Sequence, residues 1–141
     1  MMRRALLQAV ALILLAVVPA ALSALFHPKR PAFSDPLREG EIAVADVVRD
    51  PGGFLWVDAR PEAEFAKGHV PGALRLMEEE WDDLVPAVLQ AWPAGKPAVV
   101  YCSSRQCQNS TAVARRLREF NLAPVHVLKG GWEAWQGAQK K

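Results

Sequence analysis

The sequence predicts an α/β domain with a mostly parallel sheet of about five short strands and helices on both faces. Two observations support this fold class. First, short apolar runs of strand type alternate with segments of helical spacing over residues 41–138, which is typical of parallel strands joined by helical crossovers. Second, the apolar run over residues 98–101 ends at Cys102, and a polar loop then leads into a helical pattern.

Each element is expected from local signals. The expected strands are short apolar runs bounded by turn residues, at 42–44, 54–57, 73–76, 98–101 and 125–128. The expected helices are a turn at 45–49, a helix from Pro61 that stops by Gly68, residues 78–92, a helix from 110 or 111, and a closing helix after Gly131. Pro86 is expected to kink or divide the helix over 78–92, because proline lacks the N–H that a helix interior uses.

Residues 1–26 are predicted to be a transmembrane anchor or a signal peptide. Two arginines precede an almost wholly apolar stretch, and about 20 apolar residues are enough to cross a bilayer. Alternatively, Ala21-Leu22-Ser23 is a passable cleavage site, and the domain is then secreted. Because a short basic N-terminus usually stays in the cytoplasm, we expect the domain outside it, in a periplasmic or other extracytoplasmic location. Residues 27–40 read as a proline-rich linker.

Composition and charge exclude several classes of protein. With 51% hydrophobic and 23% charged residues, the chain is globular rather than disordered. Four of the 17 basic residues and none of the 15 acidic residues lie within residues 1–30, so the remainder carries a net charge of −2. A near-neutral domain makes nucleic acid an unexpected partner. Two cysteines are too few for a disulfide scaffold, and no further ligands surround them to suggest a metal site.

Cys102 is the candidate nucleophile. It lies where an expected buried strand opens into a loop that leads to a helix N-terminus. Successive backbone N–H groups in such a turn form an anion-binding concavity, and the positive end of the helix adds to the field. Because this environment favours thiolate over thiol, we expect Cys102 to be reactive rather than a filler of core space.

Three segments together resemble the rhodanese (thiosulfate sulfurtransferase) family. The first is similar to its N-terminal signature, the second to the strand that delivers its catalytic cysteine, and the third to its C-terminal strand–helix junction. They are Val57-Asp58-Ala59-Arg60-Pro61 continuing through Glu64-Phe65 to Gly68-His69-Val70-Pro71-Gly72-Ala73, then Val99-Val100-Tyr101-Cys102, and finally Leu128-Lys129-Gly130-Gly131-Trp132-Glu133-Ala134-Trp135. The resemblance covers about residues 41–137 and implies the three-layer rhodanese-like fold.

The resemblance implies a sulfurtransferase. Cys102 would attack the outer sulfur of a small anionic donor such as thiosulfate, and the resulting persulfide would pass its sulfur to a thiol, cyanide or a partner protein. No cofactor is implied, because the redox chemistry of sulfur carries the reaction. The loop must stabilise negative charge with backbone N–H groups and nearby cations. Its candidate substrate-binding residues are Ser103, Ser104, Arg105, Gln106, Cys107 and Gln108.

The loop departs from the family pattern. It is about two residues longer than the compact family loop, and Arg105 stands where a glycine is often found. A wider loop changes which donor fits, so the resemblance does not establish thiosulfate as the natural donor. Arg105 is either a substrate cation or a residue that points into solvent. Cys107 is a plain loop residue, a thiol that forms a reversible disulfide with Cys102, or a relay for sulfur; cysteine pairs beside a helix N-terminus are often redox-labile.

Three further residues are expected to support the site. Asp58 and Arg60 are predicted to hold the strand end and the loop in place; the alternative is an ordinary surface salt bridge. His69 lies in a turn and is expected to be a hydrogen-bonded structural residue rather than a catalytic base.

Two other classes of function stay open at this point. One is thiol–disulfide redox chemistry through Cys102 and Cys107, and the other is a non-catalytic rhodanese-like module that binds a partner. A related phosphatase is disfavoured, because that chemistry needs an arginine six residues after the cysteine to grip phosphate, and Gln108 stands there.

Overall fold

The computed structural model describes residues 36–140. The predicted anchor or signal peptide at residues 1–26 and most of the linker at 27–40 lie outside these residues, so both stay predictions. Within residues 36–140, no helix combines the length and the apolar character that a membrane crossing requires.

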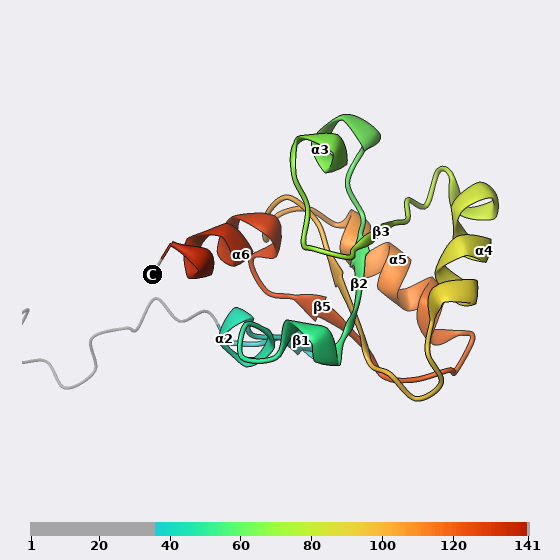
Figure 1. Ribbon diagram of the computed structural model, residues 1–141, viewed down its shortest axis with the longest axis horizontal. Coiled ribbons are helices and arrows are strands. Elements are labelled where there is room, and N and C mark those ends of the chain that lie inside the picture. The colour runs from blue at the N-terminus through green and yellow to red at the C-terminus, as the bar shows by residue number, and fades with distance from the viewer. Residues whose placement is uncertain (1–35, 141) are drawn as a thin grey trace, which may run out of the picture. The chain divides into compact units, whose positions relative to one another are not determined.

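The core of the domain is a sheet of five parallel strands, as the sequence predicts (Figure 1). Its spatial order is β1-β5-β4-β2-β3, and each neighbouring pair runs parallel. The strands are β1 (Glu41–Ile42), β2 (Leu55–Asp58), β3 (Leu74–Arg75), β4 (Ala98–Tyr101) and β5 (Val125–Leu128). The four residues of β2 and of β4 are all buried, as expected for strands covered on both faces.

Helices cover both faces of the sheet, which confirms the predicted layering (Figure 1). Alternate residues of each strand point to opposite faces, so two core clusters form. The first joins Val57 and Val100 to α4 (Trp81–Ala91) and α5 (Asn109–Arg118). The second joins Trp56, Val99 and Tyr101 to α2 (Val44–Val47), α3 (Glu62–Lys67) and α6 (Gly131–Gln139). A short 3-10 turn, η1 (Pro51–Gly53), leads into β2.

The register of β2 and β4 positions the site. Asp58 and Tyr101, the last residues of the two strands, are partners in the ladder. The backbone N–H of Ala59 then donates to the carbonyl oxygen of Tyr101 at 2.8 Å, so the pairing continues one step beyond the strands. The loops that follow β2 and β4 therefore leave the same edge side by side. In open parallel sheets, ligands bind at this carboxyl edge.

The helix expected over 78–92 differs from the prediction. It begins at Trp81 and continues to Ala91 without division, with Pro86 inside it. Pro86 is exposed, and so is Asp82, whose carbonyl loses its partner to the proline ring, so water can hydrate that carbonyl. The expected strand at 73–76 is shorter and comprises only Leu74–Arg75, whereas the strand at 125–128 matches its predicted bounds.

Candidate active site

Cys102 is the first residue after β4, and its exposed fraction is 2%. A disulfide joins it to Cys107, which is partly exposed and lies near the end of the same loop. The Cα atoms of the two cysteines are 6.1 Å apart. The bond corresponds to the disulfide alternative among the three roles considered for Cys107. The loop ends at Gln108, and α5 begins at Asn109.

Backbone N–H groups at the N-terminus of α6 form hydrogen bonds with the start of this loop. The N–H of Trp132 donates to the carbonyl oxygen of Cys102 at 2.7 Å, and the N–H of Glu133 donates to that of Ser103 at 3.1 Å. Gly131 has a φ of +57°, and a Cβ there would overlap the Cys102 carbonyl, so only glycine allows this approach. In a trans peptide the N–H points opposite to the C=O. The N–H groups of Ser103 and Ser104 are therefore directed away from α6, and they are free to face an anion on the other side.

The polar side chains of the loop have partners in other elements. The Ser103 hydroxyl donates to a carboxylate oxygen of Glu64 in α3 at 2.6 Å. The guanidinium of Arg105, the candidate substrate cation, lies 3.8 Å from the carboxylate of Glu41 in β1, so it is not directed into open solvent. At the outer turn, the Ser104 hydroxyl donates to the side-chain oxygen of Gln106 at 3.1 Å.

Asp58 and Arg60 form a buried ion pair at the end of β2, not a surface salt bridge. Their exposed fractions are 0% and 2%. The Arg60 guanidinium donates to both carboxylate oxygens, at 2.9 Å to Oδ1 and 2.6 Å to Oδ2, and also to the Gly68 carbonyl at 2.8 Å. Burial alone lowers the pKa of Arg60, but the hydrogen bond and charge of Asp58 outweigh it, so the pKa lies above its ordinary value.

Two aromatic residues connect this ion pair to the cysteine loop. The Arg60 guanidinium lies 4.7 Å from the ring centroid of Trp132 and 5.5 Å from that of Tyr101. Trp132 also supplies the N–H that binds the Cys102 carbonyl. The Tyr101 hydroxyl accepts a hydrogen bond from the N–H of Val70 at 3.0 Å. Burial, followed by the hydrogen bond to Asp58, raises the pKa of Tyr101 above its ordinary value, so this residue stays neutral.

His69 lies in the turn after α3, as expected. Its ring stacks on Phe65 with centroids 3.9 Å apart, and its Nδ1 lies 3.0 Å from the Phe65 carbonyl oxygen. Its side chain is exposed. These contacts hold the turn together and suit the structural role predicted for this residue.

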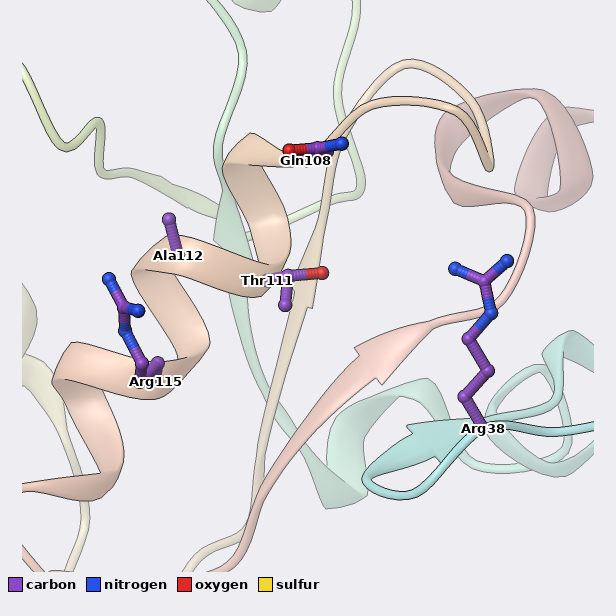
Figure 2. A pocket seen from close by; sticks show the side chains of 5 residues that line it. All are labelled: Arg38, Gln108, Thr111, Ala112 and Arg115. Atoms are coloured by element: carbon purple, nitrogen blue, oxygen red, sulfur yellow. The ribbon is translucent and has the colours of Figure 1, made fainter.

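A hollow of about 410 Å³ lies beside the end of the cysteine loop (Figure 2). Figure 2 shows Gln108, just before α5, and Thr111, in the first turn of α5, on the side that faces Arg38. Arg115 stands one turn further along α5, and its side chain is 72% exposed at 4.0 Å from Glu78. The hollow therefore brings the Arg38 guanidinium and two neutral polar groups near the positive end of α5, whereas Arg115 lies in the last turn of that helix. Its lining residues are Arg38, Gln108, Thr111, Ala112 and Arg115.

A smaller hollow of about 260 Å³ lies by the start of the loop. It includes Glu64, which holds Ser103, and Trp132, which holds Cys102. The cysteine loop thus has one hollow at each end. Its lining residues are Arg60, Glu64, Lys67, Gly68, Trp132 and Gln136.

Sequence reasoning overlooked three residues of this site. Arg38 falls within the predicted linker, and Glu64 and Trp132 appear only as members of the segments that resemble the family. Spacing did not indicate Arg38 or Glu64, because each reaches the loop from a distant part of the chain. For Trp132, the preceding pair Gly130-Gly131 was a usable signal, since two adjacent glycines allow a close backbone approach.

The domain is an α/β protein with a five-stranded parallel sheet, and a cysteine follows the carboxyl end of its central strand, β4. The family model of the rhodanese-like domain matches residues 43–138. The chain therefore belongs to the rhodanese-like domain family.

Solved structures agree with this assignment. A protein from Bacillus halodurans superposes with a TM-score of 0.60 at 22% identity, over 70% of this chain and 72% of that one. The rhodanese-like domain of an Anabaena protein gives 0.56 at 26% identity, over 72% and 76%. A thiosulfate sulfurtransferase from Pseudomonas aeruginosa gives 0.54 at 25% identity, over 79% of this chain but only 21% of that longer one. These likenesses support the fold and agree with membership in the rhodanese-like family.

Proposed function

We propose that this protein is a sulfurtransferase that carries sulfane sulfur on Cys102. The observation that supports this most is the position of Cys102 at the carboxyl end of β4, with its carbonyl and that of Ser103 held by α6. This arrangement fixes the backbone of the reactive residue and turns the next two N–H groups away from α6, where they can stabilise an anion.

The reaction begins with a reduced Cys102. Its thiolate attacks the outer sulfur of a thiosulfate-like donor, the sulfur–sulfur bond of the donor breaks, and sulfite leaves with the electron pair. An acceptor thiolate then attacks the outer sulfur of the persulfide, and Cys102 leaves as a thiolate. Because the structure holds Cys102 in a disulfide with Cys107, a thiol reductant must open that bond before the first cycle.

The charges around the loop favour an anionic donor. Arg105 lies against Glu41, so the cations of the larger hollow, Arg38 and Arg115, are better placed to attract the donor. Arg38 acts together with the positive end of α5, whereas Arg115 lies in the last turn of that helix. We expect Arg38→Gln to raise the KM for thiosulfate with little change in kcat, since long-range attraction concentrates the donor without touching the reacting atoms.

We further propose that the protein works outside the cytoplasm, held to the membrane by residues 1–26 or secreted after their removal, with a thiol or a protein as sulfur acceptor. The basic and apolar N-terminal sequence supports this location. The disulfide supports it as well, because such bonds persist in oxidising compartments. Protease protection of the full chain in sealed, oriented vesicles tests it, and digestion of the domain from the cytoplasmic side contradicts it.

The activity is tested by thiocyanate formation from thiosulfate and cyanide, with the full chain reduced beforehand. With cyanide in large excess as the acceptor, we expect turnover by the wild type and by Cys107→Ser, and none by Cys102→Ser. Undiminished turnover in Cys102→Ser contradicts the proposal. Neither sulfur uptake nor thiol exchange by the wild type points instead to a non-catalytic module that binds a partner.

A second candidate function is thiol–disulfide exchange, and the Cys102–Cys107 bond favours it. In that case both cysteines are needed to the same degree. Equal loss of disulfide reductase activity in Cys102→Ser and Cys107→Ser, without thiocyanate formation by the wild type, selects this function over sulfur transfer.

A further inference from the structure

We propose that Cys107 resolves the Cys102 persulfide, releasing hydrogen sulfide and forming the disulfide that the structure contains. This inference rests on the proposed sulfurtransferase function and specifies its acceptor. The protein would then convert thiosulfate and a dithiol into sulfite, sulfide and a disulfide. Cys107 would be a catalytic residue, because its sulfur forms a bond to the reacting atom.

The disulfide identifies which atoms can meet. The bond joins Sγ of Cys107 to Sγ of Cys102, with Cα atoms 6.1 Å apart, a separation that ordinary disulfides span. In the persulfide, Sγ of Cys102 is the inner sulfur and carries the extra sulfur outside it. The loop conformation in the structure therefore brings Cys107 within bonding reach of the inner sulfur.

The step balances without an external oxidant. The Cys107 thiolate attacks Sγ of Cys102, the bond between Sγ and the outer sulfur breaks, and the outer sulfur leaves with the electron pair as hydrosulfide. The sulfane sulfur is thereby reduced by two electrons, and the two cysteine thiols are oxidised to one disulfide. The thiol proton of Cys107 is released to solvent or to the departing sulfide.

The loop makes this attack faster than attack by an external thiol at low concentration. Both sulfurs belong to one loop, whose first residues are pinned to α6 and α3 by the Cys102 and Ser103 contacts. A reactant tethered within a short loop reaches effective concentrations in the millimolar range or above, on the order of a thousandfold over a micromolar acceptor. External acceptors therefore compete with Cys107 only when they are abundant or docked on the protein.

The disulfide must then be reopened, and the structure favours one sulfur as the point of attack. Cys102 is 2% exposed, whereas Cys107 is partly exposed. An external dithiol of the thioredoxin type reaches Cys107 first and forms a mixed disulfide there. Cys102 leaves as the thiolate that the next donor requires, and the second thiol of the reductant then releases Cys107. The second thiol is thus part of the mechanism, because it restores both cysteines.

Single-turnover chemistry tests the proposal. The full chain is reduced, freed of reductant under anaerobic conditions, and mixed with thiosulfate as the probe. We expect the wild type to release sulfide in stoichiometric amount and to end with the 102–107 disulfide and no added sulfur by intact mass. Cys107→Ser and Cys107→Ala should both retain the mass of one sulfur atom on Cys102 and release at least about tenfold less sulfide.

Several outcomes would overturn the inference. One is a wild type that keeps its persulfide while Cys107 remains open to alkylation. A second is equal sulfide release by the wild type and both Cys107 variants, and a third is extra sulfur on Cys107, which indicates a relay. Thiocyanate formation distinguishes a failure of this inference from a failure of the proposed function: if Cys107→Ser makes thiocyanate and the wild type releases no sulfide, only the role of Cys107 fails. If no variant takes up sulfur, the sulfurtransferase function fails with it.

Discussion

The loops that leave β2 and β4 begin side by side, since Asp58 and Tyr101 are register partners, yet different chemistry holds them. The β2 loop is closed by a buried ion pair, Asp58–Arg60, whose guanidinium also binds the Gly68 carbonyl. The β4 loop is closed by a disulfide between Cys102 and Cys107. The first closure persists as long as the domain is folded, whereas the second opens with any thiol of sufficient reducing power.

The two loops therefore have different roles: the ion pair of the β2 loop supports the site, and the cysteines of the β4 loop can react. Because the pKa of Arg60 is raised, its charge persists across the range in which the protein works. Trp132 contacts both loops, since its ring packs against the Arg60 guanidinium and its N–H donates to the Cys102 carbonyl oxygen. One side of the site is thus constant, and the cysteine pair beside it is free to change its bonds.

The largest expected effect is the loss of stability that follows from breaking the Asp58–Arg60 ion pair. Asp58→Asn leaves the Arg60 guanidinium buried without its counter-charge, which costs about 3–5 kcal/mol of unfolding free energy. Urea unfolding followed by tryptophan fluorescence measures it. The matched control is Glu80→Gln, which removes one carboxylate from an exposed ion pair with Arg75 and should change stability far less. Similar losses of unfolding free energy in the two variants would show that burial of the Asp58–Arg60 pair does not set its contribution to stability.

The contact between α6 and the cysteine loop comes next. Gly131→Ala places a Cβ against the Cys102 carbonyl at a positive φ, so we expect a loss of roughly 2–4 kcal/mol and a slower sulfur uptake by Cys102. Gly137→Ala is the control in the same helix, because a Cβ there meets nothing within 4 Å. That variant should gain about 0.5–1 kcal/mol from helix propensity. A neutral Gly131→Ala would show that the close approach is unimportant.

Opening the disulfide should have a smaller effect than breaking the ion pair. Closing a loop with a sequence separation of 5 limits the unfolded chain only modestly, and its reduction costs about 2 kcal/mol or less. Hydrogen exchange of the reduced chain should rise in residues 102–108 and stay unchanged around Asp58 and Arg60. Faster exchange at both loops would show that the two closures depend on each other.

The smallest expected effect is a pH dependence at Tyr101. Its pKa is raised in the folded state, so above pH 10 the unfolded chain releases a proton that the folded chain retains, and stability falls as pH rises. Tyr101→Phe removes this contribution and should flatten the decline, while losing about 1 kcal/mol at neutral pH with the hydrogen bonds of the hydroxyl. Unfolding curves at several alkaline pH values compare the two slopes, and parallel slopes would contradict the assignment.

The sheet was predictable because its determinants are local. Runs such as 98–101 and 125–128 carry strand-type side chains between clear turn signals, and alternation with helical segments implies parallel pairing. The effect of Pro86 was less predictable: of the two expected outcomes, a kink or a division, the helix over 81–91 is not divided, and Pro86 lies on its exposed side. The position of Cys102 at a strand end was equally readable, since one apolar run stops there.

The partners within the site were less predictable. Glu64 and Ser103 lie 39 residues apart, and Arg105 meets Glu41 across the sheet edge, so no spacing indicates either pair. Whether Asp58–Arg60 is buried or exposed also depends on Tyr101 and Trp132 closing over it. The pairing of the two cysteines was one of several open alternatives until their backbones were placed.

The proposal that Cys102 carries sulfane sulfur is tested most directly by the mass of the peptide that contains this residue. Cys107→Ser full chain, reduced and then exposed to thiosulfate, is digested and examined by peptide mass spectrometry. We expect one added sulfur on the peptide that contains Cys102. This sulfur should be removed by cyanide and should be absent from Cys102→Ser. An unmodified Cys102 under conditions in which thiosulfate is consumed would contradict it.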